Sequence, residues 1–233
     1  MWKASVAEHA RHEPALRALL SASELERGAR FHFDADRVRH SVSHGLLRRL
    51  AGHYLSRPPA ELRFAQGEYG KPHVSGVDEG GLVFNLSHSG DVVLIALAPG
   101  GRVGVDVECW TRRIDEQGLE RIAEYAFSAQ ERAALRRLTP ENRRAAFFSV
   151  WSLKEAYIKA TGLGVAHGLH QFDVLAVSGE ACLVEDRRGE VDVGQWAMYD
   201  LAPGPGYSGA LATDDRSRTL VKLNADWALL SEQ

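Results

Sequence analysis

Two pairs of helices are evident in the pattern of apolar and polar positions, and the two pairs are alike. The first pair spans residues 20–31 and 36–55, and the second spans 127–138 and 141–162. In each pair the shorter helix begins with a serine that is followed three residues later by a glutamate, which is the signature of a capping box. The last helix has a proline in its first turn and stops at Gly162, as helix ends commonly do.

Runs typical of strands follow the helices in both halves. They are expected at 61–66 and 82–98 in the first half, and at 172–177, 181–186, 195–202 and 207–213 in the second. The order helix, helix, strands therefore occurs twice, and a glycine-rich loop at 98–102 separates the halves. This pattern predicts an α+β fold of two similar subdomains packed side by side, covering residues 1–100 and 101–233. The alternative is coincidence, because helix pairs followed by strands are common.

Composition narrows the class of protein. Of the 233 residues, 45% are hydrophobic and 25% are charged, which is the usual mix for a soluble globular protein. A net charge of −3 does not suggest nucleic-acid binding. Cys109 and Cys182 form no CxxC pair, and we expect both to be reduced thiols. The N-terminus lacks the apolar stretch of a signal peptide, and the longest aliphatic run, 92–98, is too short to cross a bilayer. We therefore expect a cytoplasmic protein without a membrane anchor.

The first chemical signal is a pair of carboxylates on a strict alternation at 101–108. Val103, Val105 and Val107 point to one face of the expected strand, and Asp106 and Glu108 point to the other. The two carboxylates then lie roughly 7 Å apart along the strand. They would repel one another without a cation, so the pKa of each would rise. The alternative is an acidic edge that faces solvent.

A third carboxylate interrupts an apolar helical stripe. Phe148, Trp151, Glu155 and Ile158 follow one another in steps of three, four and three residues, so they share a face of the helix. A buried carboxylate is costly unless it is paired or binds a metal. Three carboxylates together would suit a hard cation, and Mg²⁺ fits best because it also accepts water and phosphate oxygens. The alternative is a structural salt bridge between Glu155 and an arginine of the first half.

Cationic and small polar side chains supply what phosphate groups need. Lys154 and Lys159 lie on the same helix as Glu155, and Lys71 lies in a glycine–lysine–proline turn. Arginines gather on the first two helices, namely Arg27, Arg30, Arg37 and Arg39. A carboxylate set beside several cations indicates a site for a polyphosphate ester. The segment FNLSHSG at 84–90 adds a polar cluster at a strand end, which is either a ligand site or a turn with satisfied hydroxyls.

Four motifs in this order resemble one family. They are GKP at 70–72, FNLSHSG at 84–90, VGVDVE at 103–108 and WSLKEAYIKATG at 151–162. The chain resembles the 4′-phosphopantetheinyl transferases of the larger, two-subdomain (Sfp-like) type. The motifs span about 90 residues, and the ordered set is specific although each motif alone is weak.

The resemblance implies a fold, a reaction and partners. The two halves are expected in a pseudo-twofold arrangement, each a small antiparallel sheet with packed helices, and the active site lies in the cleft between them. The reaction moves the phosphopantetheine arm of coenzyme A to a serine of a carrier protein, as a holo-[acyl-carrier-protein] synthase does, and releases adenosine 3′,5′-bisphosphate. The carrier serves fatty acid, polyketide or nonribosomal peptide synthesis. The fused halves make a monomer the expected state.

The resemblance also implies residue roles. Asp106, Glu108 and Glu155 match the magnesium ligands, and Lys154 and Lys159 match the helix lysines, with Lys159 facing the pyrophosphate. Ser87 and His88, assisted by Lys71, match residues that meet the 3′-phosphate of coenzyme A, and Arg27 and Arg39 occupy basic positions. Two departures are Glu24, where some members have a basic residue, and Gly168, where the family often has proline.

Mechanism and docking follow as hypotheses. We expect Asp106, Glu155 and Lys159 to be catalytic, and either Glu155 or a metal-bound water to take the proton of the carrier serine. A docking surface for an acidic carrier is expected near 111–138, with Arg112, Arg113 and Arg121. The alternatives are a magnesium-dependent hydrolase of nucleotide esters and a non-catalytic binder of coenzyme A or carrier domains.

Overall fold

The computed structural model describes residues 1–67, 69–78, 80–110, 114–164, 168–177, 180–189 and 191–227. The first half contains β1 (Trp2–Ser5), α1 (Val6–His9), α2 (Glu13–Arg17), α3 (Ala22–Ala29), α4 (Asp34–Leu55), β2 (Phe64–Gln66), β3 (Pro72–Val74), β4 (Leu82–Ser89) and β5 (Val92–Pro99). The second half contains β6 (Val103–Cys109), α5 (Glu116–Ala126), α6 (Ala129–Arg136), α7 (Pro140–Thr161), β7 (Phe172–Val177), β8 (Glu180–Asp186), β9 (Ala197–Leu201), β10 (Tyr207–Thr213) and β11 (Leu223–Asn224).

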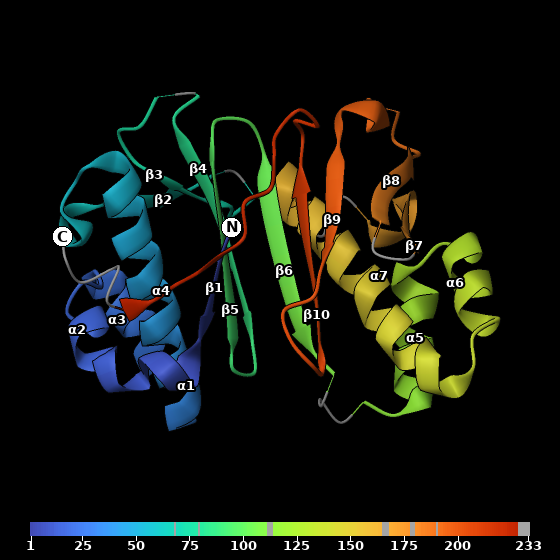
Figure 1. The fold of residues 1–233 in the computed structure, drawn as a ribbon, viewed down its shortest axis with the longest axis horizontal. Helices are drawn as coiled ribbons and strands as arrows, with labels where there is room; N and C mark the ends of the chain where they lie inside the picture. The colour runs from blue at the N-terminus through green and yellow to red at the C-terminus, as the bar shows by residue number, and fades with distance from the viewer. Residues whose placement is uncertain are drawn as a thin grey trace.

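Two main sheets stand side by side, and helices cover the outer side of each (Figure 1). The strand orders are β11-β1-β5-β4 and β6-β10-β9-β8-β7, and β2 pairs separately with β3. Apart from the short parallel pair of β1 and β11, the pairings are antiparallel. The predicted α+β class with antiparallel sheets and packed helices is confirmed.

A strand precedes the helices in each half, and in the second half it is the strand expected at 101–108. β1 pairs with β5, and β6 pairs in the same antiparallel sense with β10, so the first strand of each half lies against its last hairpin strand. The two halves therefore resemble one another in the pairing of their first strands as well as in the helix pairs seen in the sequence.

The C-terminal segment departs from the predicted division at residue 100. β11 pairs with β1, and Ala225 and Trp227 pack in the core of the first half. The ring of Trp227 also stacks on His12, with centroids 3.9 Å apart. Residues 223–227 therefore pack with the first half, although the predicted division at residue 100 assigns them to the second.

The halves are joined through β5 and β6. Val93 and Ile95 of β5 face the core beneath α4, whereas Val92, Leu94 and Ala96 pack against the valines of β6. Because β5 is buried on both faces, its sequence is an unbroken apolar run rather than an alternation.

Helix α7 lies directly against β6 at Gly104. A Cβ atom at this position would stand 2.0 Å from the carbonyl oxygen of Ala156 and 2.4 Å from the backbone nitrogen of Ala160. Only a residue without a side chain allows this approach. It places the helix that carries Glu155 over the face of β6 that carries Asp106 and Glu108.

Within the described ranges, none of the helices combines the length and the apolar character needed to span a membrane.

Candidate active site

Asp106 is the most enclosed of the three predicted carboxylates. It is 3% exposed, and its Oδ1 lies 2.6 Å from Nζ of Lys159. The same oxygen accepts a hydrogen bond of 3.1 Å from the hydroxyl of Ser87. The other carboxylate oxygen, Oδ2, is buried without a hydrogen-bond partner. A buried anionic oxygen without a partner is costly, and such a site favours a cation.

Glu108 lies two residues further along the same face of β6. Its Oε1 accepts a hydrogen bond of 3.3 Å from the indole nitrogen of Trp151, and its Oε2 accepts one of 3.4 Å from the hydroxyl of Ser89. Trp151 lies one helical turn before Glu155, so both strand carboxylates face α7.

Glu155 completes the group from α7. Burial raises the pKa of its carboxyl, and the negative charge of Asp106 raises it further. Lys159 opposes the shift, and Glu108 adds to it. The structure therefore brings together the three carboxylates and Lys159. In the sequence they lie on two elements, a strand and a helix, about 50 residues apart.

The carboxylate oxygens of this group determine whether it could bind a metal ion. Over the ranges that the structure describes, no group of three His, Cys, Asp or Glu side chains is arranged so that it could already hold a metal ion. The residues nevertheless fit a hard cation, since Oδ2 of Asp106 has no partner and Glu155 carries an unfavourable charge beside two acids. A cation between them would relieve both costs.

A cleft of about 810 Å³ opens beside Lys159. Its walls come mainly from the first half, from α3, α4, the β2–β3 hairpin and β4, and Lys159 joins them from α7. Ser87 and Lys159 line this cleft and both contact Asp106, so this carboxylate lies next to the cleft wall. The cleft thus belongs mostly to one half and meets the second half at its edge.

His88 and two arginines lie along the cleft or close to it. Arg27 and His88 line it. Arg39 is held by Asp36, 2.8 Å away, and by the carbonyl oxygen of Gly90. Burial lowers the pKa of His88 to about 4, and the positive charge of Arg39 contributes to the shift. His88 is therefore neutral at pH 7.

Sequence reasoning missed an ion pair in the wall of the cleft. Arg48, which is 1% exposed, lies 2.7 Å from Glu24 and also donates to the carbonyl oxygens of Pro59 and Leu62. Hydrogen bonds from His44 and Arg48 hold the pKa of Glu24 far below its usual range against the effect of burial. The signal was available, because Arg48 interrupts the buried positions of α4 as Glu155 interrupts those of α7.

Lys154 lies in the core of the second half and does not line the cleft, unlike the position predicted for it beside phosphate groups. Its side chain is 0% exposed, and Nζ lies 2.9 Å from Glu131. It also donates to the carbonyl oxygens of Leu169 and Phe172. Lys154 and Lys159 are five residues apart, which turns them about 140° from one another around the helix. One lysine therefore enters the core of the second half while the other reaches the cleft.

Lys71 lies in the seam between the halves. Its Nζ donates to the carbonyl oxygens of Val103 and Ala160, at 3.0 and 2.8 Å. Burial lowers the pKa of this ammonium group to about 8, and nearby Arg102 adds to the effect. In this structure Lys71 caps the end of α7, and its neighbours Gly70 and Pro72 line the cleft.

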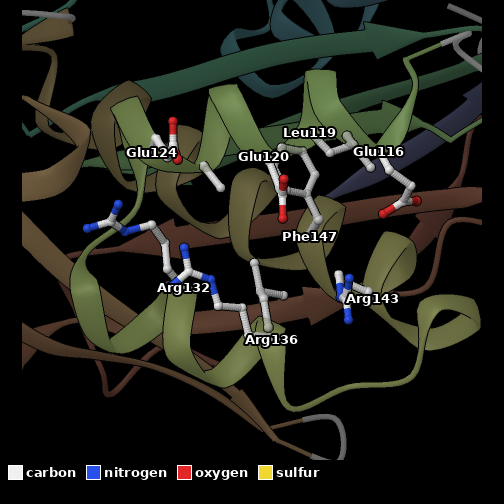
Figure 2. A pocket seen from close by; sticks show the side chains of 10 residues that line it. Glu116, Leu119, Glu120, Glu124, Arg132, Arg136, Arg143 and Phe147 are labelled. Carbon is white, nitrogen blue, oxygen red and sulfur yellow. The ribbon is translucent and has the colours of Figure 1, made fainter.

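A second, narrow hollow of about 40 Å³ lies between α5 and α6 (Figure 2). Glu116, Glu120 and Glu124 project along one side, with Arg132, Arg136 and Arg143 opposite. It overlaps the region in which carrier docking was predicted. Arg121 of that prediction is exposed on α5, and Arg112 and Arg113 lie outside the described residues.

Comparison with known proteins finds matches in one family. The family model of the 4′-phosphopantetheinyl transferase superfamily matches residues 102–212, and a model of the N-terminal part of a 4′-phosphopantetheinyl transferase matches residues 1–100. The chain is 34% identical over 198 residues to the 4′-phosphopantetheinyl transferase HetI of Nostoc sp., covering 84% of this chain and 79% of that protein. It is 36% identical over 171 residues to the 4′-phosphopantetheinyl transferase psf-1 of Bacillus pumilus, covering 72% and 69%.

Among solved structures, a holo-(acyl-carrier-protein) synthase from Bacillus anthracis in complex with CoA (3′,5′-ADP) aligns with a TM-score of 0.39 and 19% identity. The alignment covers 48% of this chain and 92% of that one. The length and identity of the match to HetI decide the assignment. The chain therefore belongs to the 4′-phosphopantetheinyl transferase superfamily and is an enzyme of that family.

Proposed function

We propose that the protein transfers the 4′-phosphopantetheine arm of coenzyme A to a serine of a carrier protein in a magnesium-dependent reaction. The observation that carries this proposal is the position of Lys159, which lines the cleft and contacts Asp106 in front of two further carboxylates. An ammonium group at that point can meet a pyrophosphate lying in the cleft. We further propose that the enzyme is a monomer, because its cleft and carboxylates come from one chain. We also propose that it acts in the cytoplasm.

In the proposed reaction, the serine hydroxyl attacks the phosphorus that bears pantetheine. The bond from that phosphorus to the bridging oxygen breaks, and the electron pair leaves with adenosine 3′,5′-bisphosphate. Asp106, Glu108 and Glu155 would hold Mg²⁺, which supplies charge neutralisation for the pyrophosphate when bound. Lys159 stabilises the charge that develops on the leaving phosphate, and Arg27 and His88 orient the 3′-phosphate from the wall of the cleft.

The serine proton needs an acceptor. We assign this step to Glu155, because burial and the charges of two neighbouring acids raise the pKa of its carboxyl and make it the stronger base. The positive charge of Lys159, one helical turn further on, partly opposes this shift.

The test is mass spectrometry of a purified apo carrier protein incubated with coenzyme A, with and without Mg²⁺. We expect a gain equal to one phosphopantetheine arm, only when Mg²⁺ is present. Glu155→Gln preserves shape and removes the charge, so it should abolish the gain while the protein stays folded by circular dichroism. Release of phosphopantetheine without carrier would indicate a hydrolase instead, and binding of coenzyme A without any chemistry would indicate a binding protein.

The proposed carrier surface is the exposed side of α5. Arg121 is exposed there, and the family resemblance implies a carrier domain that is acidic around its serine. Arg121→Glu should raise the KM for the carrier and leave the KM for coenzyme A unchanged. An unchanged KM for the carrier would remove α5 from the docking surface.

A further inference from the structure

Two serines of β4 contact the two carboxylates of β6 in the same way. The hydroxyl of Ser87 donates to Asp106 at 3.1 Å, and the hydroxyl of Ser89 donates to Glu108 at 3.4 Å. Each hydroxyl also accepts a hydrogen bond from the backbone N–H of the residue after its carboxylate, at 3.3 Å for Ser87 and 3.1 Å for Ser89. The unit therefore repeats with the two-residue period of both strands.

Both serines are buried and come from the other half of the molecule. Ser87 and Ser89 are 8% and 6% exposed, and β4 and β6 belong to different sheets. The contacts thus cross the seam between the halves, and they fix the side-chain rotamers of acids that the second half supplies.

The hydroxyl of Ser87 uses its full hydrogen-bonding capacity within the protein. A hydroxyl has one donor and two acceptor positions. The donor is used on Asp106, and the acceptors receive the N–H of Val107 and Nζ of Lys159, which is 3.1 Å away. This arrangement fits a role of the Ser87 hydroxyl in orienting the acid and the lysine.

We propose that Ser87 and Ser89 are positioning residues of the metal site, contributed by the first half. By holding Oδ1 of Asp106 and Oε2 of Glu108, they hold each carboxylate in one orientation, and in Asp106 they leave Oδ2 for the cation. Groups that orient metal ligands in this way commonly change metal affinity by about 10-fold to 100-fold when they are removed. The inference rests on the proposed function, because it assumes that the acids bind Mg²⁺.

The chain contains a matched control in Asn85, two residues before Ser87. Its Oδ1 accepts the N–H of Val105 at 2.8 Å, so it makes the same kind of bond across the seam. The residue before Val105 is Gly104, which has no carboxylate to orient. Asn85→Ala therefore removes a seam contact without touching an acid.

The experiment measures the dissociation constant of Mg²⁺ alone by titration calorimetry, together with the free energy of unfolding in urea. We expect Ser87→Ala and Ser89→Ala each to weaken Mg²⁺ binding about tenfold, and Ser87→Thr, which keeps a hydroxyl, to restore most of it. Asn85→Ala should lower the free energy of unfolding and leave the Mg²⁺ dissociation constant within about twofold of the wild-type value.

Three outcomes overturn the proposal. In the first, the serine variants bind Mg²⁺ as tightly as the wild type. In the second, Asn85→Ala weakens binding as much as they do, which would make the seam a general structural contact. In the third, the wild type binds no Mg²⁺. The carrier modification assay distinguishes these results from a failure of the proposed function. If the wild type transfers the arm and either of the first two outcomes is found, the proposal about the serines fails and the proposed function does not.

Discussion

Nζ of Lys159 lies 2.6 Å from Oδ1 of Asp106, so that a lysine of α7 and an aspartate of β6 meet at the edge of the cleft. This ion pair links α7 to β6, the two elements that also pack against each other at Gly104. It also marks where a phosphate in the cleft would come closest to the carboxylates.

Lys159→Gln should therefore lower kcat for arm transfer by about 100-fold or more, because a preorganised cation at the reacting phosphate is lost. Steady-state kinetics with carrier and coenzyme A, supported by a thermal unfolding curve to verify folding, measures this. Lys159→Arg keeps the charge and should retain more activity than the glutamine variant. A fully active Lys159→Gln enzyme would place the chemistry elsewhere.

Lys154 should behave in the opposite way, because its partner is Glu131 in the core. Burial lowers the pKa of Lys154 and raises that of Glu131, and each offsets part of the shift in the other. Lys154→Met leaves Glu131 buried without its cation, which should cost about 3–5 kcal/mol in free energy of unfolding. Urea denaturation measures the loss.

The double variant Lys154→Met with Glu131→Gln removes the uncompensated charge and should recover part of that loss. Coenzyme A affinity of the folded Lys154→Met protein should equal the wild-type value. Weak coenzyme A binding with normal stability would return Lys154 to the phosphate site.

His88 should take up protons when a 3′-phosphate binds. Its pKa of about 4 in the free protein leaves it neutral at pH 6, and an adjacent phosphate anion favours the protonated ring and raises that pKa. Calorimetry of coenzyme A binding at pH 6, in two buffers with different ionisation enthalpies, gives the number of protons exchanged.

The wild type should take up more protons than His88→Gln, because the variant retains only the contribution of the phosphate itself. With dephospho-coenzyme A, which lacks the 3′-phosphate, the two proteins should not differ. An equal proton balance with coenzyme A would show that His88 does not meet the phosphate.

Lys71 should make stability rise with pH above about 8. Its pKa is lowered from 10.5 to about 8 in the folded state, so between those values the unfolded chain binds more protons than the folded one. The free energy of unfolding then increases with pH, by roughly 1 kcal/mol per pH unit from this group. Below pH 8 both states are protonated, and the contribution is flat.

Urea denaturation from pH 7 to pH 10 tests this against Lys71→Met, which has no titrating group. The wild type should show the steeper rise above pH 8, and the two slopes should agree below it. Parallel curves throughout would mean that the ammonium group of Lys71 is as well solvated in the folded protein as in the unfolded chain.

Local pattern in the sequence determined the elements and the acids. Both capping boxes, at Ser21 and at Ser128, are present as predicted. The alternation around Asp106 placed two carboxylates on one face of a strand, and the helical steps placed Glu155 on one face of a helix, because side-chain direction within a strand or a helix follows its own period. The order of helices and strands in each half indicated the fold class for the same reason.

Only the tertiary structure decided which groups meet across elements. The separation of Lys154 from Lys159, the engagement of Ser87 with Asp106, and the return of β11 to the first half depend on how β4, β6 and α7 pack. Sequence period assigns a side chain to a face but does not say which surface that face will meet. The serines of β4 meet carboxylates that lie about 20 residues further along the chain, in the other half. β11 pairs with β1, which lies more than 200 residues before it.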